Sequence, residues 1–220
     1  MYNFILRTFT GLFILTFAIL ISDIASANLL NNFNGSKKKA RVNQRRTINT
    51  ATRSKCIPSV GDGEIELLVP DMSVAHHTSS ANPSLNIFSR TEVPIKPVFT
   101  LIDPKSPQPL VEKQIEIDQP GIKKISLPSE VELKNNKVYL WNLAIPCLNT
   151  SKYYQIVLSA GIEKIKVSPQ VTKELRQPIS NLEKINIYNE HGLWYETIEL
   201  VLQGLSEREI NLLLVHNYLF

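Results

Sequence analysis

Residues 138–145 read Val-Tyr-Leu-Trp-Asn-Leu-Ala-Ile, and this segment decides the fold. Successive side chains of a β-strand point to opposite faces, and both faces of this segment are almost wholly apolar. One face would carry Tyr139, Trp141, Leu143 and Ile145, and the other Val138, Leu140 and Ala144. A strand that is apolar on both faces is typical of the centre of a sheet. We therefore predict a central strand over Lys137–Ala144 that is covered on both sides.

The chain around this strand shows period-two alternation from Glu64 to about Val167, broken every eight to twelve residues by Pro, Gly, Asn or Ser. This pattern is typical of an antiparallel β-sandwich of the immunoglobulin-like kind, with short strands in two packed sheets. The other predicted strands are Glu64–Val69, Ser84–Phe88, Pro97–Ile102, Leu110–Ile117, Ile122–Leu127, Tyr153–Leu158 and Ile162–Val167. Turns are predicted at Gln119–Gly121, Asn135–Asn136 and Ser159–Gly161, the last as a hairpin between the final two strands.

After Pro169 the apolar period changes from two to about 3.6, which indicates helices. One apolar stripe contains Ile179, Leu182, Ile185 and Tyr188, and a second contains Trp194, Ile198 and Val201. Gly192 is predicted to end the first helix and Gly204 the second, and a third helix should begin at Ser206. The first two helices look like a single tetratricopeptide hairpin, which needs the sandwich or a partner to cover its apolar face.

The first 27 residues have the pattern of a cleavable export signal. Arg7 gives a positive start, an apolar stretch follows, and Ala25-Ser26-Ala27 forms a small-residue cleavage site, so the mature chain should begin at Asn28. The apolar run Phe9–Ile21 is shorter than the roughly 20 residues that span a bilayer. We therefore predict export to the periplasm or the extracellular surface. The predicted organisation is a signal peptide at 1–27, a linker at 28–55, a β-sandwich at 56–168 and a helical tail at 169–220.

The linker at 28–55 carries eight basic residues and no acidic residue, whereas residues 56–220 have 15 Lys and Arg against 19 Asp and Glu. Its composition is polar, so we expect a disordered, solvated segment. Its charge could attract an acidic glycan or another anionic surface, and nucleic acid is the least favoured polyanion for an exported chain. The residues that would make this contact are Lys37, Lys38, Lys39, Arg41, Arg45 and Arg46.

Cys56 and Cys147 are the two cysteines of the chain. An even cysteine count in an exported protein favours a disulfide, and two buried thiols are the alternative. A pair so far apart in sequence gives no metal-site spacing.

Few residues have a pattern typical of catalysis or metal binding. His76-His77 could contribute to a metal site, but a solvated loop is the preferred interpretation. Glu190-His191-Gly192 should end a helix, because His suits a helix C-terminus and Gly supplies the left-handed cap. Glu112 and Glu116 lie on the polar face of a predicted strand and should be solvated. Since known nucleophile, phosphate and metal motifs are absent from the sequence, we expect no enzyme, no cofactor and no metal.

Several segments together resemble the cyanobacterial domain of unknown function 928. They are Cys56-Ile57-Pro58 before Leu67–Pro70, Asn82–Phe88, Pro120–Ile122 before Ser126–Pro128, Tyr139–Trp141 before Cys147, and Ile187–Tyr195. The resemblance covers roughly Cys56 to Val201. It implies an exported, envelope-associated domain without an assigned biochemical activity.

Two functions follow as hypotheses. The first is a non-catalytic cell-envelope interaction module that binds another exported protein. The alternative is a glycan-binding β-sandwich helped by the basic linker, with Phe88, Tyr153 and Tyr154 as stacking residues if they are exposed together.

Overall fold

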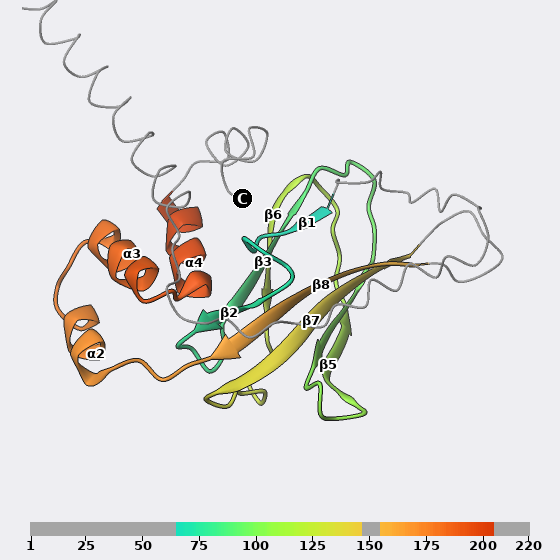
Figure 1. Ribbon diagram of the computed structural model, residues 1–220. Coiled ribbons are helices and arrows are strands. Elements are labelled where there is room, and N and C mark those ends of the chain that lie inside the picture. Colours follow the sequence, from blue (N-terminus) through green and yellow to red (C-terminus); the bar gives the residue numbers. More distant parts are fainter. Residues whose placement is uncertain (1–64, 147–154, 205–220) are drawn as a thin grey trace, which may run out of the picture.

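The computed structural model describes residues 65–146 and 155–204, which form two β-sheets and three short helices (Figure 1). The strands are β1 (Ile65–Leu67), β2 (Ala75–Thr78), β3 (Ser84–Ser89), β4 (Val98–Ile102), β5 (Pro109–Gln114), β6 (Gly121–Ser126), β7 (Lys137–Pro146) and β8 (Gln155–Lys164). The helices are α2 (Pro169–Leu175), α3 (Asn181–Glu190) and α4 (Trp194–Gly204). The prediction of a mainly β chain that ends in helices is confirmed for these residues.

The larger sheet has the order β2-β8-β7-β4-β5, so the predicted central strand β7 has a hydrogen-bonded neighbour on each side. Its ladder with β8 runs without a break from the Lys137–Lys164 pair to the Pro146–Gln155 pair. The four odd-numbered residues Tyr139, Trp141, Leu143 and Ile145 are buried, as predicted. The opposite face is only half-buried, so the expectation of full cover on both sides was too strong.

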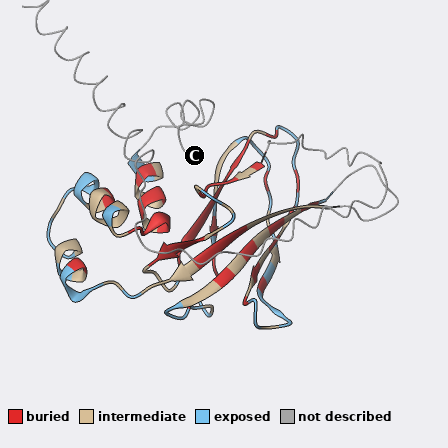
Figure 2. Ribbon diagram, viewed as in Figure 1, coloured by how far each residue is buried: buried red, intermediate tan, exposed pale blue. Residues whose placement is uncertain are grey.

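The smaller sheet has the order β1-β3-β6 and shares one hydrophobic core with the larger sheet. Leu85 and Ile87 of β3 are fully buried, as are Phe99 and Leu101 of β4 in the other sheet. Figure 2 shows these buried stretches along the strands and on α4, whereas most of α2 and most of α3 are intermediate or exposed. The hydrophobic effect of this common core holds the two sheets together.

Two strand predictions were wrong, and both concern β8 and its neighbour. The predicted turn at Ser159–Gly161 is the middle of the continuous strand β8. Ala160 lies opposite Trp141 in the ladder, so a small residue faces a large one there. The strand β2 was not predicted, and it pairs in parallel with Gly161–Lys164, so the larger sheet is not purely antiparallel.

Residues at the helix termini account for where α3 begins and ends. Ser180 and Glu183 form a capping box at the start of α3, with each side chain accepting the backbone N–H of the other. Gly192 has φ = 68°, so the predicted left-handed stop after α3 is confirmed. The structure describes α4 as far as Gly204 and describes no residue after it, so the predicted end of α4 stays a prediction. The short helix α2 was not predicted, and the third helix expected from Ser206 lies outside the described residues.

Helix α4 joins the helical part to both sheets. The indole N–H of Trp194 donates to the carbonyl oxygen of Leu68, which follows β1, at 2.9 Å. The hydroxyl of Tyr195 donates to the carbonyl oxygen of Gly161 on β8 at 3.1 Å. These two bonds come from adjacent residues of one helix and reach different sheets. Trp194 and Tyr195 thus anchor α4 on the sheets.

Candidate functional site

The histidine pair lies on β2 and is buried, which corrects the expectation of a solvated loop. His76 is fully buried and His77 is 4% exposed. The two rings point to opposite faces of the strand because side chains alternate there. The Nε2 atom of His76 lies 2.8 Å from the carbonyl oxygen of Asp71 and 3.2 Å from its backbone nitrogen. The His76 ring also packs at 51° against Trp194, with centroids 6.2 Å apart.

His77 faces an acidic neighbour across the parallel ladder. Glu163 is its register partner on β8, and its Oε2 atom lies 3.5 Å from the Nε2 atom of His77. Both histidines therefore contribute to holding β2 in place. Among residues 65–146 and 155–204, no group of three or more His, Cys, Asp or Glu is arranged to hold a metal ion.

Glu196 closes the end of β2 from helix α4. One carboxylate oxygen, Oε1, accepts four hydrogen bonds of 2.7 to 3.0 Å, from the hydroxyl groups of Thr78 and Ser79 and the backbone N–H groups of Ser79 and Ser80. The other oxygen, Oε2, is buried and accepts no hydrogen bond from any described residue. Because charge-assisted bonds of this kind are strong, Glu196 fixes the direction in which the chain leaves β2. No pattern in the sequence predicted this role of Glu196.

A buried polar chain connects β7, α4 and β8. The indole N–H of Trp141 donates to the Tyr195 hydroxyl at 3.0 Å, and that hydroxyl donates to Gly161. Burial raises the pKa of Tyr195 far above its ordinary value, against the smaller lowering effect of the bond from Trp141. The hydroxyl therefore stays protonated and acts as a structural donor.

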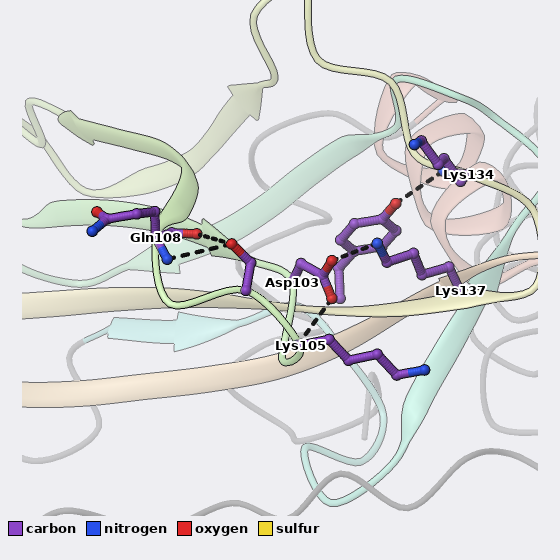
Figure 3. Close-up of polar contacts among 7 residues, drawn as sticks. Asp103, Lys105, Gln108, Lys134 and Lys137 are labelled. Atoms are coloured by element: carbon purple, nitrogen blue, oxygen red, sulfur yellow. Dashed lines mark hydrogen bonds and ion pairs between the residues drawn. The ribbon is translucent and has the colours of Figure 1, made fainter.

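Asp103 and Lys137 form an ion pair at the end of the larger sheet where β4 ends and β7 begins (Figure 3). The Asp103 carboxylate also accepts the backbone N–H of Lys105 at 3.0 Å. These bonds, that from Lys137 first, hold the pKa of Asp103 below its usual range. The bond to Asp103 in turn raises the pKa of Lys137. The Lys137 ammonium also lies 5.3 Å from the centre of the Tyr139 ring.

A pocket of about 350 Å³ lies between β1 and β8. Its lining residues are mostly apolar: Ile65, Glu66, Leu67, Val69, Pro70, Asp71, Met72 and Leu158. Its two carboxylates already have partners within the fold. Glu66 forms an ion pair with Arg90, and Asp71 accepts the backbone N–H and the hydroxyl of Ser73 at 2.7 Å. Among its described lining residues, the pocket therefore offers apolar surface and two carboxylates that already have partners.

The remaining predicted sites divide into those that the structure describes and those outside it. Glu112 and Glu116 are exposed, as expected, and His191 caps α3. Phe88 is 4% exposed and lies under the Arg90 guanidinium, 4.7 Å from the ring centre, so it is not a surface aromatic. Outside the described residues lie Tyr153, Tyr154, Cys56, Cys147, the cleavage site Ala27–Asn28 and the basic residues of the linker. In the described part of the chain, no helix is long and apolar enough to cross a membrane.

Taken together, these residues define a mainly β protein with two sheets and three short C-terminal helices, whose buried polar groups hold the helices on the sheets. The chain belongs to the family of the Domain of Unknown Function DUF928, whose model matches residues 48–215. This match confirms the resemblance seen in the sequence and includes every described element. Comparison with curated proteins and with solved structures gives no significant match.

Proposed function

We propose that the protein is an exported, non-catalytic interaction module of the cell envelope, and that its helices bind another exported protein. Export, to the periplasm or the extracellular surface, is supported by the signal-like pattern of residues 1–27. The proposal assigns the sheets the role of a scaffold and the helices the role of contact surface.

The observation that carries this proposal is the incomplete cover of α3. This helix packs against α4 through Ile185, which is buried. Leu182 in its first turn is 51% exposed, and Ile187 and Tyr188 are only half-buried. A single exposed leucine is ordinary, but here it belongs to a helix whose other apolar side chains are also partly uncovered. Such a helix has apolar area that a partner could bury.

The absence of catalysis in this proposal is supported by what the candidate acid and base groups do. The ring of His76 contacts the backbone of Asp71, and His77 pairs with Glu163. Glu196 is held by the turn after β2. Each of these groups makes contacts within the fold that account for its position there.

Glycan binding is the second candidate function. The residues that support it in the structure differ from the aromatic residues that the sequence suggested. Stacking on Phe88 is ruled out by its burial under Arg90. The observation in its favour is a concentration of lysine side chains at one end of the larger sheet, most of which have no acidic partner among the described residues.

We also propose that the two sheets form an immunoglobulin-like β-sandwich. The shared core and the antiparallel ladders of β7 with β4 and β8 support this description. The parallel pair of β2 and β8 departs from it.

Affinity capture with a matched pair of variants tests the interaction module. The mature chain 28–220, a Leu182→Lys variant and a Leu110→Lys variant would each be immobilised and exposed to envelope extract. Leu110 is 44% exposed on β5, so it controls for a new surface charge away from the helices. We expect a protein that binds the mature chain and the Leu110 variant and is lost with the Leu182 variant. A set of captured proteins that is the same for both variants would contradict the proposal.

Export has its own test. Mass spectrometry of the protein recovered from its source should find an N-terminus at Asn28. Recovery of an intact Met1 start from the envelope fraction would contradict cleavage.

A further inference from the structure

We propose that one end of the larger sheet is a binding surface for an acidic polysaccharide. This surface, called the lysine end, consists of Lys105, Lys134, Lys137, Lys164 and Lys166. The proposal rests on the second candidate function, glycan binding, and moves its site from the basic linker at 28–55 to the folded part of the chain.

The topology gathers these lysines from three separate segments. Lys105 lies in the loop between β4 and β5, Lys134 precedes β7, and Lys137 begins it (Figure 3). Lys164 ends β8 directly opposite Lys137 in the antiparallel ladder, and Lys166 follows two residues later. Two bonds fix this end further: the backbone N–H of Lys134 donates to the Tyr139 hydroxyl at 3.1 Å, and that of Asn136 donates to the carbonyl oxygen of Lys164 at 2.7 Å.

Most of these ammonium groups have no negative partner. Within the described residues, Lys137 forms an ion pair with Asp103, whereas the side chains of the other four lysines form none. Three lysines elsewhere on the sheets are paired with acids: Lys96 with Glu116, Lys123 with Asp118, and Lys124 with Glu199. Lys113 on β5 instead donates to the carbonyl oxygen of Ser126.

The local charge opposes that of the rest of the fold. The segments 103–108, 132–137 and 164–166 hold five lysines and two carboxylates, although residues 56–220 as a whole have more acids than bases. A positive end on a mildly acidic domain is a concentrated patch, and such a patch attracts and orients polyanions.

The facing pair Lys137 and Lys164 supports a role in binding. Like charges directly opposite each other in a ladder are destabilising. The Asp103 carboxylate offsets the positive charge of Lys137, but no described carboxylate pairs with Lys164. A bound polyanion would supply the missing negative charge. A local conflict of this kind, without a compensating ion pair among the residues that the structure describes, is typical of a functional surface.

The side chains between the lysines favour a polysaccharide over a lipid surface. Gln108, Asn135 and Asn136 are exposed, and their amides can bond to sugar hydroxyl and carboxylate oxygens. Binding to a bilayer normally adds exposed apolar side chains to basic ones. The three segments carry no exposed large hydrophobic residue among the described positions.

The test compares two triple variants of the mature chain 28–220 for binding to polygalacturonate, a carboxylated polysaccharide, by calorimetry at low salt. The first combines Lys134→Gln, Lys164→Gln and Lys166→Gln, leaving the Asp103 pair intact. The control combines Lys173→Gln on α2, Arg176→Gln directly after α2 and Lys184→Gln on α3, which removes the same charge elsewhere. Since exposed ion pairs are individually weak, we expect about tenfold weaker binding for the first variant and little change for the control. The same difference should persist when the eight basic residues at 28–55 are replaced by Gln.

The Asp103→Asn variant provides a second measurement, in which the affinity for polygalacturonate should change in the opposite direction. It removes a carboxylate from the lysine end and keeps an oxygen that can accept the Lys105 N–H, so polygalacturonate should bind more tightly. Unchanged or weaker binding would count against the lysine end.

The possible outcomes distinguish a failure of the lysine end from a failure of glycan binding. Equal loss of affinity in both triple variants would overturn the lysine end and leave glycan binding standing. An absence of binding by the unmodified mature chain would overturn glycan binding itself. Binding to phosphatidylglycerol vesicles, but not to polygalacturonate, that depends on these lysines would overturn the choice of a polysaccharide.

Discussion

The indole N–H of Trp141 donates a 3.0 Å hydrogen bond to the hydroxyl of Tyr195, and this bond joins the centre of the larger sheet to α4. Trp141 is fully buried and Tyr195 is 2% exposed, so water cannot replace either partner. The relationship ties the C-terminal helices to the strand that is most central in the fold.

Replacing Tyr195 with Phe should destabilise the protein by about 1–3 kcal/mol, because the Trp141 N–H would be left buried without an acceptor. Urea unfolding followed by tryptophan fluorescence measures the change. Tyr188→Phe is the control. Because Tyr188 is only half-buried, this substitution should lower the free energy of unfolding only slightly. A Tyr195→Phe variant as stable as the original protein would refute the structural role of this hydroxyl.

Glu196→Ala should cost about 2–3 kcal/mol, because the four donors held by one oxygen would lose their partly buried acceptor. Glu199→Ala, on the same helix, removes only a surface pair with Lys124 and should cost less than about 1 kcal/mol. Hydrogen exchange should also become faster at the amides of Ser79 and Ser80 in the Glu196 variant alone. Equal effects of the two substitutions would be inconsistent with the structure.

Asp103 should make stability depend on acid pH. The unfolded chain binds a proton at this carboxyl near the ordinary pKa of about 3.9, whereas the folded protein, whose pKa is lowered, binds it only at lower pH. The stability that Asp103 contributes is therefore complete above that ordinary value and is lost as pH falls through the folded pKa. Urea midpoints from about pH 5.5 down to about pH 2.5 should differ between the original protein and Asp103→Asn at the upper end and converge at the lower end. A difference that does not vary with pH would show that the charge of Asp103 is unimportant.

Gly192→Ala should destabilise the protein by about 1 kcal/mol, because φ = 68° strains a residue with a Cβ atom. Gly204→Ala is the matched control: a Cβ atom there would meet nothing within 4 Å, and alanine favours a helix. Thermal unfolding of the two variants compares them directly. If Gly204→Ala proved the more damaging change, the assigned cap would be wrong.

The pairing of Cys56 with Cys147 stays a prediction, because both lie outside the described residues. A disulfide between them would close a loop of about 90 residues, for which the chain-entropy model gives roughly 4–5 kcal/mol as an upper guide. Peptide mapping without a reducing agent should find the two cysteine peptides linked. Alkylation of both thiols in the unreduced protein would exclude the bond.

Strong periodic segments of the sequence predicted the fold well. The central position of β7 followed from its apolar faces, and the end of α3 followed from Gly192. The strand β2 was missed because four residues with two histidines show no apolar alternation. The continuous strand β8 was broken by the prediction because Ser, Ala and Gly usually mark a turn, whereas here small residues lie where Trp141 and Tyr195 approach.

The polar sites were harder to predict because their partners are far apart in sequence. Glu196 lies 118 residues from Thr78, and Lys137 lies 34 residues from Asp103. The buried state of His76 also depends on Trp194, which packs on it from α4. Only the three-dimensional arrangement brings these groups together, so no spacing rule applied to the chain could have found them.

The parallel pairing of β2 with β8 also sets an order of events for folding. During synthesis β2 is made early, but its ladder partner Gly161–Lys164 and Glu196, which holds its end, are made much later. Contacts between such distant parts of a chain form slowly, because the long intervening loop must first be closed. A ribosome-bound chain that stops short of α4 contains all five strands of the larger sheet but lacks Glu196, which holds the end of β2. The native state therefore becomes accessible only after nearly the whole described chain has emerged.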